Sequence, residues 1–254
     1  MNLLLAELRR LTSRRIFKIP VMVFFGLLTI GLILTVVSAL FVEKDPRSLH
    51  RSEVPDIDLI FAPFNFWLAL LAVVIGSSSL GAEFGAASLS TQLLFEPRRI
   101  RVLLTKAAAL VLCYAAFMVV FLSIIAALNI SEVDEPGGTS WPRVIADGSQ
   151  IVGVSSLFAL IAFSITAFTR KTAGAVFALF GVFLTEVLFL ARFEWVRPRL
   201  PIMRLISIVA FSSGTDTFGE SVQVDLVAAF VVGTIWTAVF LGAATWYFSK
   251  AEIR

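Results

Sequence analysis

The chain has 254 residues, of which 58% are hydrophobic and 15% charged, with a formal net charge of +3 and a mean hydropathy of +0.92. Its 18 acidic and 21 basic residues cannot supply the polar shell that a soluble core with so much apolar surface would need. The composition therefore excludes an ordinary soluble domain and predicts a single all-α domain that crosses a membrane several times.

Residues 1–18 are expected to form an amphipathic elbow helix ahead of the first span. Leu4, Leu8 and Leu11 recur at helical spacing, while Glu7, Arg10 and Arg14 lie close together on another face. A basic amphipathic helix of this kind suits the surface of an anionic cytoplasmic leaflet. The alternative is that the charges act only as an orientation signal for the first span.

Six apolar stretches meet or approach the roughly 20 residues that a membrane-spanning helix needs. The first exceeds the length of a signal-peptide core and is not followed by a small-residue cleavage site, so we expect it to remain as a span. The fourth is the shortest. The predicted spans are residues 19–42, 59–80, 102–128, 151–168, 173–191 and 226–248.

The charges of the loops orient these spans. With both termini in the cytoplasm, the cytoplasmic segments hold thirteen basic and four acidic residues, and the outer loops hold eight basic and twelve acidic residues. This distribution follows the positive-inside rule. The outer segment 192–225 opposes it with four arginines, and its apolar run 202–211 is too short to cross. We expect an interfacial or re-entrant helix there, or one packed on top of the spans.

The cytoplasmic segment 81–101 joins the second and third spans. Leu89 and Leu93 lie one turn apart, and Glu83 is expected in the first turn of a helix, where the helix dipole favours an acid. Pro97 would end this helix before a basic cluster. The pattern predicts a short helix along the membrane surface.

This segment resembles the cytoplasmic coupling helix of the membrane subunits of type-2 ATP-binding-cassette exporters. In that family a Glu and an aromatic residue precede a Gly-Thr-like pair, a Leu-rich turn, a Pro, an Arg pair and a Lys that opens the third span. The chain departs from the pattern at Gly85, Ala87 and Ser88, where the family more often has a basic residue, Gly and Thr. The matching positions are Glu83, Phe84, Ala87, Ser88, Leu93, Leu94, Pro97, Arg98, Arg99 and Lys106.

The resemblance implies a permease subunit of an ATP-driven exporter. Its coupling helix would fit a groove on a separate cytoplasmic ATPase, with Phe84 as an apolar anchor and Arg98 and Arg99 as charges at the rim. It also implies two ATPase copies carrying ATP and Mg, and a second permease that is identical or homologous. Drugs, peptides, lipids and polysaccharides are the cargo classes of the family. The alternative without a partner is a structural interfacial helix.

The chain itself is expected to have no catalytic site, no cofactor and no metal. A phosphate-binding loop needs Gly-Lys followed by Ser or Thr, and none of the five lysines follows a glycine. His50 is the single histidine, which argues against a histidine-based metal site or catalytic triad. We expect membrane lipids and not nucleic acid as further partners, and a bacterial plasma membrane as the location.

Two features inside the spans could also serve function. Glu186 in the fifth span could contact a cationic substrate or relay protons, or it could be neutral and hydrogen-bonded where helices pack. Gly174, Ala178 and Gly181 form a small-residue stripe that suits either a subunit contact or a contact within one bundle. The other functional readings are a secondary transporter or channel that uses Glu186, and a membrane scaffold or sensor that does not transport.

Overall fold

The computed structural model describes residues 3–13, 57–86, 88–96, 98–128, 141–188 and 226–250, with a few positions between 18 and 29. Within this part of the chain every regular element is an α-helix, and no strand is present. The seven helices are α1 (Leu3–Ser13), α3 (Ile57–Gly85), α4 (Ser88–Phe95), α5 (Arg99–Leu128), α6 (Trp141–Thr169), α7 (Thr172–Leu188) and α9 (Leu226–Lys250).

Four of these helices are long and apolar enough to cross a membrane, with candidate spans at 68–85 in α3, 99–124 in α5, 148–169 in α6 and 230–250 in α9. Helix α7 is apolar and is described over 17 residues, and the last three residues of the predicted span 173–191 lie outside the described part. The all-α prediction is thus confirmed for the described residues, and the four long helices are consistent with an α-helical membrane protein. The predicted span 19–42 lies mostly, and the outer segment 192–225 wholly, outside the described residues.

Helix α6 is longer than the fourth predicted span, because it begins at Trp141 and not at residue 151. Pro142 stands in its first turn, where the missing N–H of a proline leaves no hydrogen bond unmade. The polar residues just before 151 lower the hydropathy without ending the helix, whose backbone hydrogen bonds are internal. The polar side chains can also bond within the helix, since the Ser149 hydroxyl donates to the Ala146 carbonyl oxygen at 2.7 Å.

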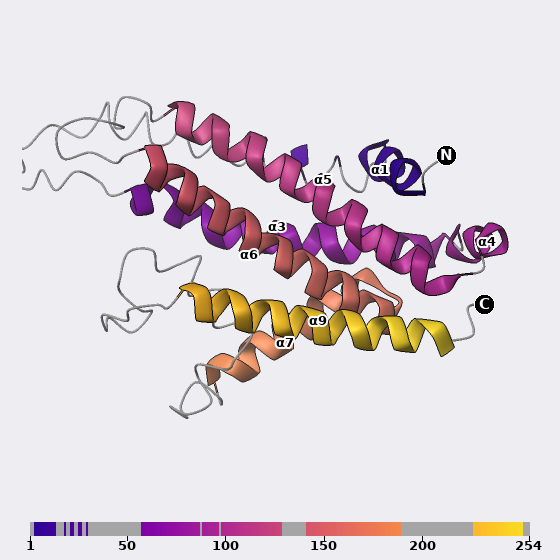
Figure 1. Cartoon of the computed structure of the whole chain (residues 1–254). Helices are drawn as coiled ribbons and strands as arrows, with labels where there is room; N and C mark the ends of the chain where they lie inside the picture. Colours follow the sequence, from indigo (N-terminus) through magenta and orange to yellow (C-terminus); the bar gives the residue numbers. More distant parts are fainter. Residues whose placement is uncertain are drawn as a thin grey trace, which may run out of the picture.

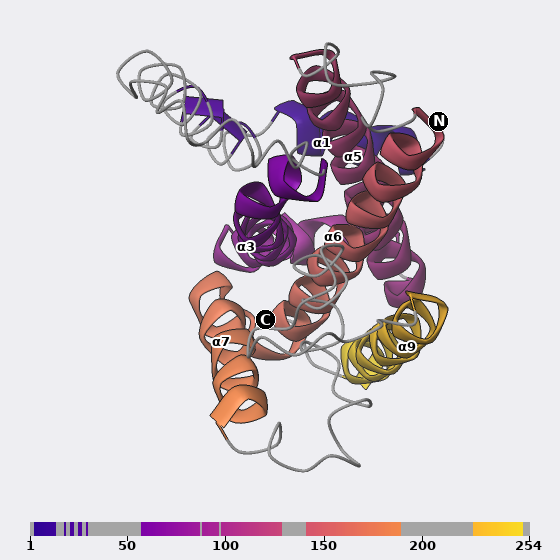
Figure 2. The same cartoon turned by 90° about the vertical axis from the view of Figure 1, so that its left-hand side faces the viewer.

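Helices α3 and α6 form the centre of the bundle and pack against each other more extensively than any other pair. Helices α1 and α5 lie on one side of this pair, and α7 and α9 lie on the other (Figure 1 and Figure 2). Two glycines of α3 bring backbones into direct contact. A Cβ on Gly76 would overlap the carbonyl oxygen of Ala159 in α6, and one on Gly81 would overlap the side chain of Thr172 in α7.

The core between these helices is apolar and rich in aromatic rings. Tyr114, Phe121 and Phe163 are almost completely buried. The one phenol among them is satisfied, since the Tyr114 hydroxyl donates to the Leu68 carbonyl oxygen at 3.0 Å. Tyr114 therefore joins α5 to α3 by a hydrogen bond as well as by packing.

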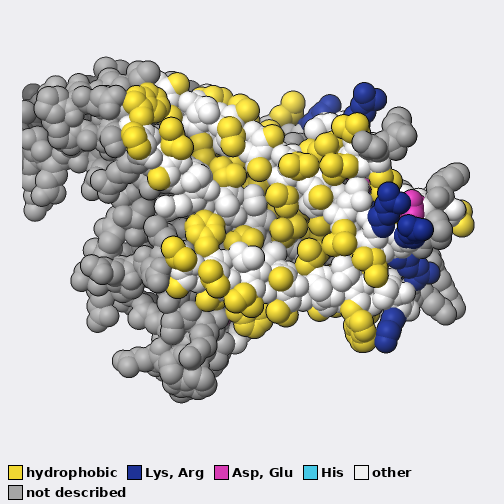
Figure 3. All heavy atoms as spheres, in the orientation of Figure 1, with side chains coloured by type: hydrophobic (Ala, Val, Ile, Leu, Met, Phe, Trp, Pro, Cys, Tyr) yellow, Lys and Arg dark blue, Asp and Glu magenta, His cyan; other side chains and the backbone are white. Residues whose placement is uncertain are grey.

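One end of the bundle carries α1, α4 and the C-terminal end of α9 (Figure 1). The turn between α6 and α7 lies at the same end, because Thr172 contacts Gly81 near the end of α3. In that turn Arg170 has a φ of 56°, and its N–H donates to the Thr166 carbonyl oxygen at 2.8 Å, which ends α6 with a left-handed cap. The Lys and Arg side chains on the face shown gather at this end, whereas hydrophobic side chains are spread over the remainder of the described surface (Figure 3).

Candidate functional site

Four elements meet at the basic end of the bundle: α1, the last turn of α3, α4 and the first turns of α5. The structure corrects the expected position of Glu83. Helix α3 continues without a break to Gly85, so Glu83 lies in its last turn and not in the first turn of the short helix. That short helix is α4, and it begins at Ser88. Glu83 therefore does not open a helix, and its side chain is buried in the protein, where the residue is 1% exposed.

Glu83 belongs to a buried charge cluster that we define as Glu7, Arg10, Glu83 and Lys106. The Lys106 Nζ lies 2.7 Å from Glu83 Oε2 and 3.0 Å from Glu7 Oε1. Arg10 Nη1 lies 3.4 Å from both Glu7 Oε1 and Glu83 Oε1. Both carboxylates and the lysine are at most 4% exposed. Two cations thus face two anions, so the cluster is neutral as a whole and joins α1, α3 and α5.

Helix α4 is tied to this cluster by side-chain hydrogen bonds. Arg10 donates through Nη2 to Ser88 Oγ at 3.0 Å and through Nη1 to Gln92 Oε1 at 2.9 Å. Gln92 Nε2 in turn donates to Glu7 Oε1 at 2.6 Å. Because charge-assisted hydrogen bonds are short and directional, these contacts hold the inner side of α4 against α1. The same end of the bundle thus holds α1 and α4 in one connected polar network.

The electrostatic balance of the cluster is visible at Glu7. Burial by itself would raise the pKa of this carboxyl, but the charge of Lys106, hydrogen bonds from Lys106 and Gln92, and the charge of Arg10 together lower the pKa below its usual 4.5. Glu7 is therefore ionised at neutral pH although it is buried. The attraction of the Glu7 carboxylate to Lys106 and Arg10 is greatest when Glu7 is ionised.

The attachment of α1 should accordingly depend on pH. A carboxyl with a lowered folded-state pKa stabilises the folded form fully above its unfolded value of 4.5, and this contribution is lost as the pH falls through the folded value. We expect nitroxide labels in Thr12→Cys and Ser123→Cys, on a Cys113→Ala background, to show a broader distance distribution as the pH falls from about 6 to about 3. A Glu7→Gln variant should respond less. Identical distributions at both pH values would contradict the prediction.

The outer side of α4 is the part of the short helix that could meet a partner. Leu89 is 1% exposed, and Leu93 packs against the core. Leu94, by contrast, is 83% exposed, and Thr91 beside it is also exposed. Helix α4 therefore presents an exposed leucine at the charged end of the bundle, while its other side is held by packing and hydrogen bonds.

Phe84, the expected apolar anchor, does not occupy such a position. It is half-buried, packs against the core and makes an edge contact with Phe248 of α9 at a ring-centroid distance of 6.5 Å. Its location in the continuous helix α3, one residue after Glu83, turns it toward the bundle. Among the apolar residues of the predicted set that the structure describes, Leu94 is the one that is exposed as an anchor must be. Arg98 is exposed and Arg99 is half-buried, while Ala87 and Pro97 lie outside the described residues.

The small-residue stripe of α7 does not form one continuous open face. A Cβ on Gly174 would contact the Thr169 side chain at 3.0 Å, and Ala178 packs against the core of this chain. Gly181 is exposed, with no atom close to the position of a Cβ. Two of the three small residues thus serve contacts within the bundle.

Glu186, near the end of the same helix, is 2% exposed and is therefore buried within the protein.

Sequence reasoning placed Glu7 and Arg10 together on one face of α1 and placed Lys106 at the start of a span, but it did not join them. The signal was present at Lys106. A lysine at the start of a largely apolar helix requires an anionic partner, but no local pattern in the sequence indicates Glu7, which is 99 positions away. Gln92 carried no comparable signal, because a glutamine on a short surface helix usually faces water.

Comparison with known proteins adds no family to this description. No protein-family model matches the chain, and no curated protein matches it significantly.

Proposed function

We propose that this chain is the permease subunit of an ATP-driven exporter, and that it couples to a separate cytoplasmic ATPase through α4. The observation that carries the proposal is the position of Leu94. It is an 83% exposed leucine on a short helix whose inner residues are buried or hydrogen-bonded. An exposed apolar residue on a rigidly attached helix is what a groove on a partner protein can grip.

The charges at this end of the bundle favour the cytoplasmic side. Exposed basic residues lie at the same end of the bundle as α4, and positively charged ends of membrane proteins stay in the cytoplasm. With this orientation α4 would face the compartment that contains ATP. The exposed basic residues are Arg9, Arg98, Arg101, Lys171 and Lys250.

The buried charge cluster supports a mechanical role for α4. Through Arg10 and Gln92 the helix is bonded to α1, and the cluster bonds α1 to α3 and α5 through Lys106 and Glu83. A force on Leu94 would thus reach two long apolar helices through short polar contacts. In the proposed cycle, closure of two ATPases would shift α4 and, with it, the inner ends of α3 and α5.

The proposal is tested by capture of the affinity-tagged chain from native membranes, followed by substitution of Leu94. We expect a stoichiometric chain with a phosphate-binding loop in the captured complex. Leu94→Asp should lower its recovery on the order of tenfold or more, because a buried apolar anchor typically contributes at least about 2 kcal/mol to an interface. The melting temperature should not change, since the side chain lies on the surface.

Thr12→Asp is the matched control, because it places the same charge on an exposed position of α1 at the same end of the bundle. It should leave ATPase recovery unchanged. Normal recovery with Leu94→Asp would refute the contact. The absence of any ATPase chain from a stable complex would refute the exporter assignment and favour a secondary transporter, a channel or a scaffold.

A further inference from the structure

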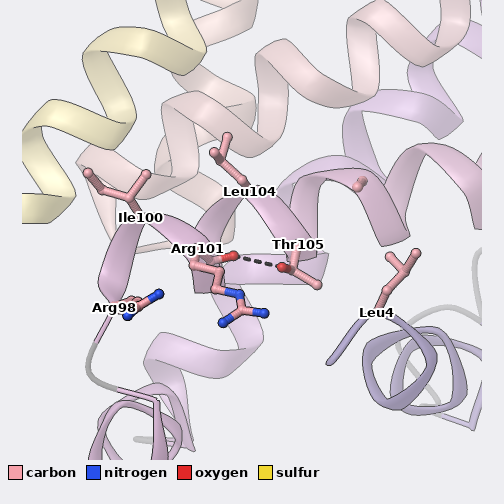
Figure 4. Close-up of a pocket in the computed structure, with 7 residues that line it drawn as sticks. Leu4, Arg98, Ile100, Arg101, Leu104 and Thr105 are labelled. Atoms are coloured by element: carbon pink, nitrogen blue, oxygen red, sulfur yellow. Dashed lines mark hydrogen bonds between the residues drawn. The ribbon is translucent and has the colours of Figure 1, made fainter. Parts of the chain in front are cut away.

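A groove runs between α1 and the beginning of α5, on the outer side of the bundle (Figure 4). Its volume is about 590 Å³. Leu4 of α1 forms one wall, and the opposite wall comes from residues 98–108 at the start of α5. The candidate span of α5 begins at Arg99. The groove thus lies where the polar end of the bundle passes into its membrane-spanning part.

The two ends of this groove differ in chemistry. Arg98 and Arg101 lie at its polar end, and both are exposed. Arg101 has one long ion pair, with Nη1 3.9 Å from Glu96 Oε2, and its side chain remains 60% exposed. A guanidinium has five N–H donors, so such a contact leaves most of them available to an anion.

The remainder of the groove is apolar. Ile100, Leu104 and Ala108 follow one another at intervals of four residues, and therefore form a strip along one side of α5. Ile100 is 47% and Leu104 44% exposed. The Thr105 hydroxyl donates to the Arg101 carbonyl oxygen at 2.7 Å, so its proton is already used within the helix (Figure 4).

We propose that this groove binds an anionic phospholipid of the adjacent leaflet, with its phosphate on Arg98 and Arg101 and an acyl chain along Ile100, Leu104 and Ala108. The groove extends about 10 Å along α5 from Arg101 to Ala108, at 1.5 Å per residue. That is the greater part of the roughly 15 Å of hydrocarbon in one leaflet. The guanidinium groups thus lie at headgroup level when the apolar strip lies among the chains.

Charge complementarity selects the lipid over an uncharged amphiphile. A zwitterionic headgroup would bring its own ammonium close to two arginines, whereas phosphatidylglycerol brings a phosphate without a cation. Leu4 makes α1 part of the site, so a bound lipid would bridge α1 and α5 from the outside, as the buried charge cluster joins them from the inside. The site requires only a membrane and does not depend on an ATPase partner.

Native mass spectrometry of the detergent-purified chain tests the site directly. The chain is titrated with phosphatidylglycerol, with phosphatidylethanolamine, and with glycerol 3-phosphate as a headgroup without chains. We expect phosphatidylglycerol to bind best and glycerol 3-phosphate not to displace it. Arg98→Gln/Arg101→Gln should weaken phosphatidylglycerol binding about 10- to 30-fold, because two cations near a lipid phosphate contribute on the order of 1 kcal/mol each.

Lys171→Gln/Lys250→Gln is the matched control, since it removes two exposed cations from the same end of the bundle outside the groove. It should retain binding within about twofold. Equal weakening in both double variants would overturn the site in favour of general charge attraction. Equal binding of the two lipids would overturn its anion selectivity, and displacement by glycerol 3-phosphate would identify a free phosphate site instead.

Photocrosslinking of the unaltered chain keeps the proposal testable should the arginine variant fold poorly. Phosphatidylglycerol with a diazirine on its acyl chain should label residues between 100 and 108 of α5. Labelling spread evenly over the exposed faces of α5 and α9 would overturn the site. A protein dimer that loses phosphatidylglycerol labelling at these residues would show that a second copy covers the groove.

Discussion

Replacing Lys106 by methionine is expected to destabilise the fold strongly. The change leaves Glu7 and Glu83 buried without the ammonium group that lies 3.0 Å and 2.7 Å from their oxygens. Removal of one partner from a buried ion pair typically costs about 3–5 kcal/mol, because the remaining charge keeps its desolvation penalty. Arg10 cannot replace the loss, since its guanidinium is 3.4 Å from both carboxylates and already bonds α4.

Thermal unfolding in detergent measures this effect. Lys106→Met should lower the melting temperature by several degrees, while Lys250→Met, the same chemical change on an exposed side chain at the same end, should leave it nearly unaltered. The double variant Glu83→Gln/Lys106→Met should recover part of the loss, because it removes one of the two carboxylate charges that Arg10 alone would have to balance. A Lys106→Met protein as stable as Lys250→Met would show that the cluster contributes little to stability.

The second large effect is expected for Gly76→Ala in the centre of α3. The added Cβ would overlap the carbonyl oxygen of Ala159 and come within 2.9 Å of its carbonyl carbon and Cα. These are backbone atoms, so α3 and α6 must move apart along the most extensive helix pair of the bundle. Overpacking of this kind costs about 1–3 kcal/mol, against a gain of at most about 1 kcal/mol in helix propensity.

Gly85→Ala provides the comparison within the same helix. A Cβ at this position has no atom within 4 Å, so the substitution should be neutral or slightly stabilising. Melting temperatures of the two variants in one detergent would separate close helix packing from a general effect of glycine. If Gly76→Ala were as stable as Gly85→Ala, the close approach of α3 to α6 would be wrong.

Both predictions bear on the proposed transmission of force. Lys106 and Gly76 hold α3 to α5 and to α6, whereas Leu94 and Arg98 lie on the surface. Variants of the first pair should therefore change stability, and variants of the second pair should change binding at constant stability. This difference distinguishes residues that hold the helices together from residues that contact a partner or a lipid.

The sequence by itself determined the helical class, the long apolar helices and the amphipathic face of α1. Hydrophobic runs longer than a soluble helix needs can be satisfied only in lipid, so composition and length were sufficient. The Leu4, Leu8 and Leu11 stripe is present as predicted, although the structure packs it against Ala109 and Cys113 of α5. Periodicity shows that a face is apolar, but not whether lipid or protein covers it.

The tertiary structure alone decided where Glu83, Phe84 and Leu94 lie. Helix α3 extends past its apolar run because lysine and arginine partners neutralise Glu83 there, and those partners come from α1 and α5. Glu83 pairs with Arg10, 73 positions away, and with Lys106, 23 positions away, and such pairings are not visible in a local pattern. The burial of Phe84 follows from that extension, whereas the exposure of Leu94 follows from the hydrogen bonds that hold the other side of α4 against α1.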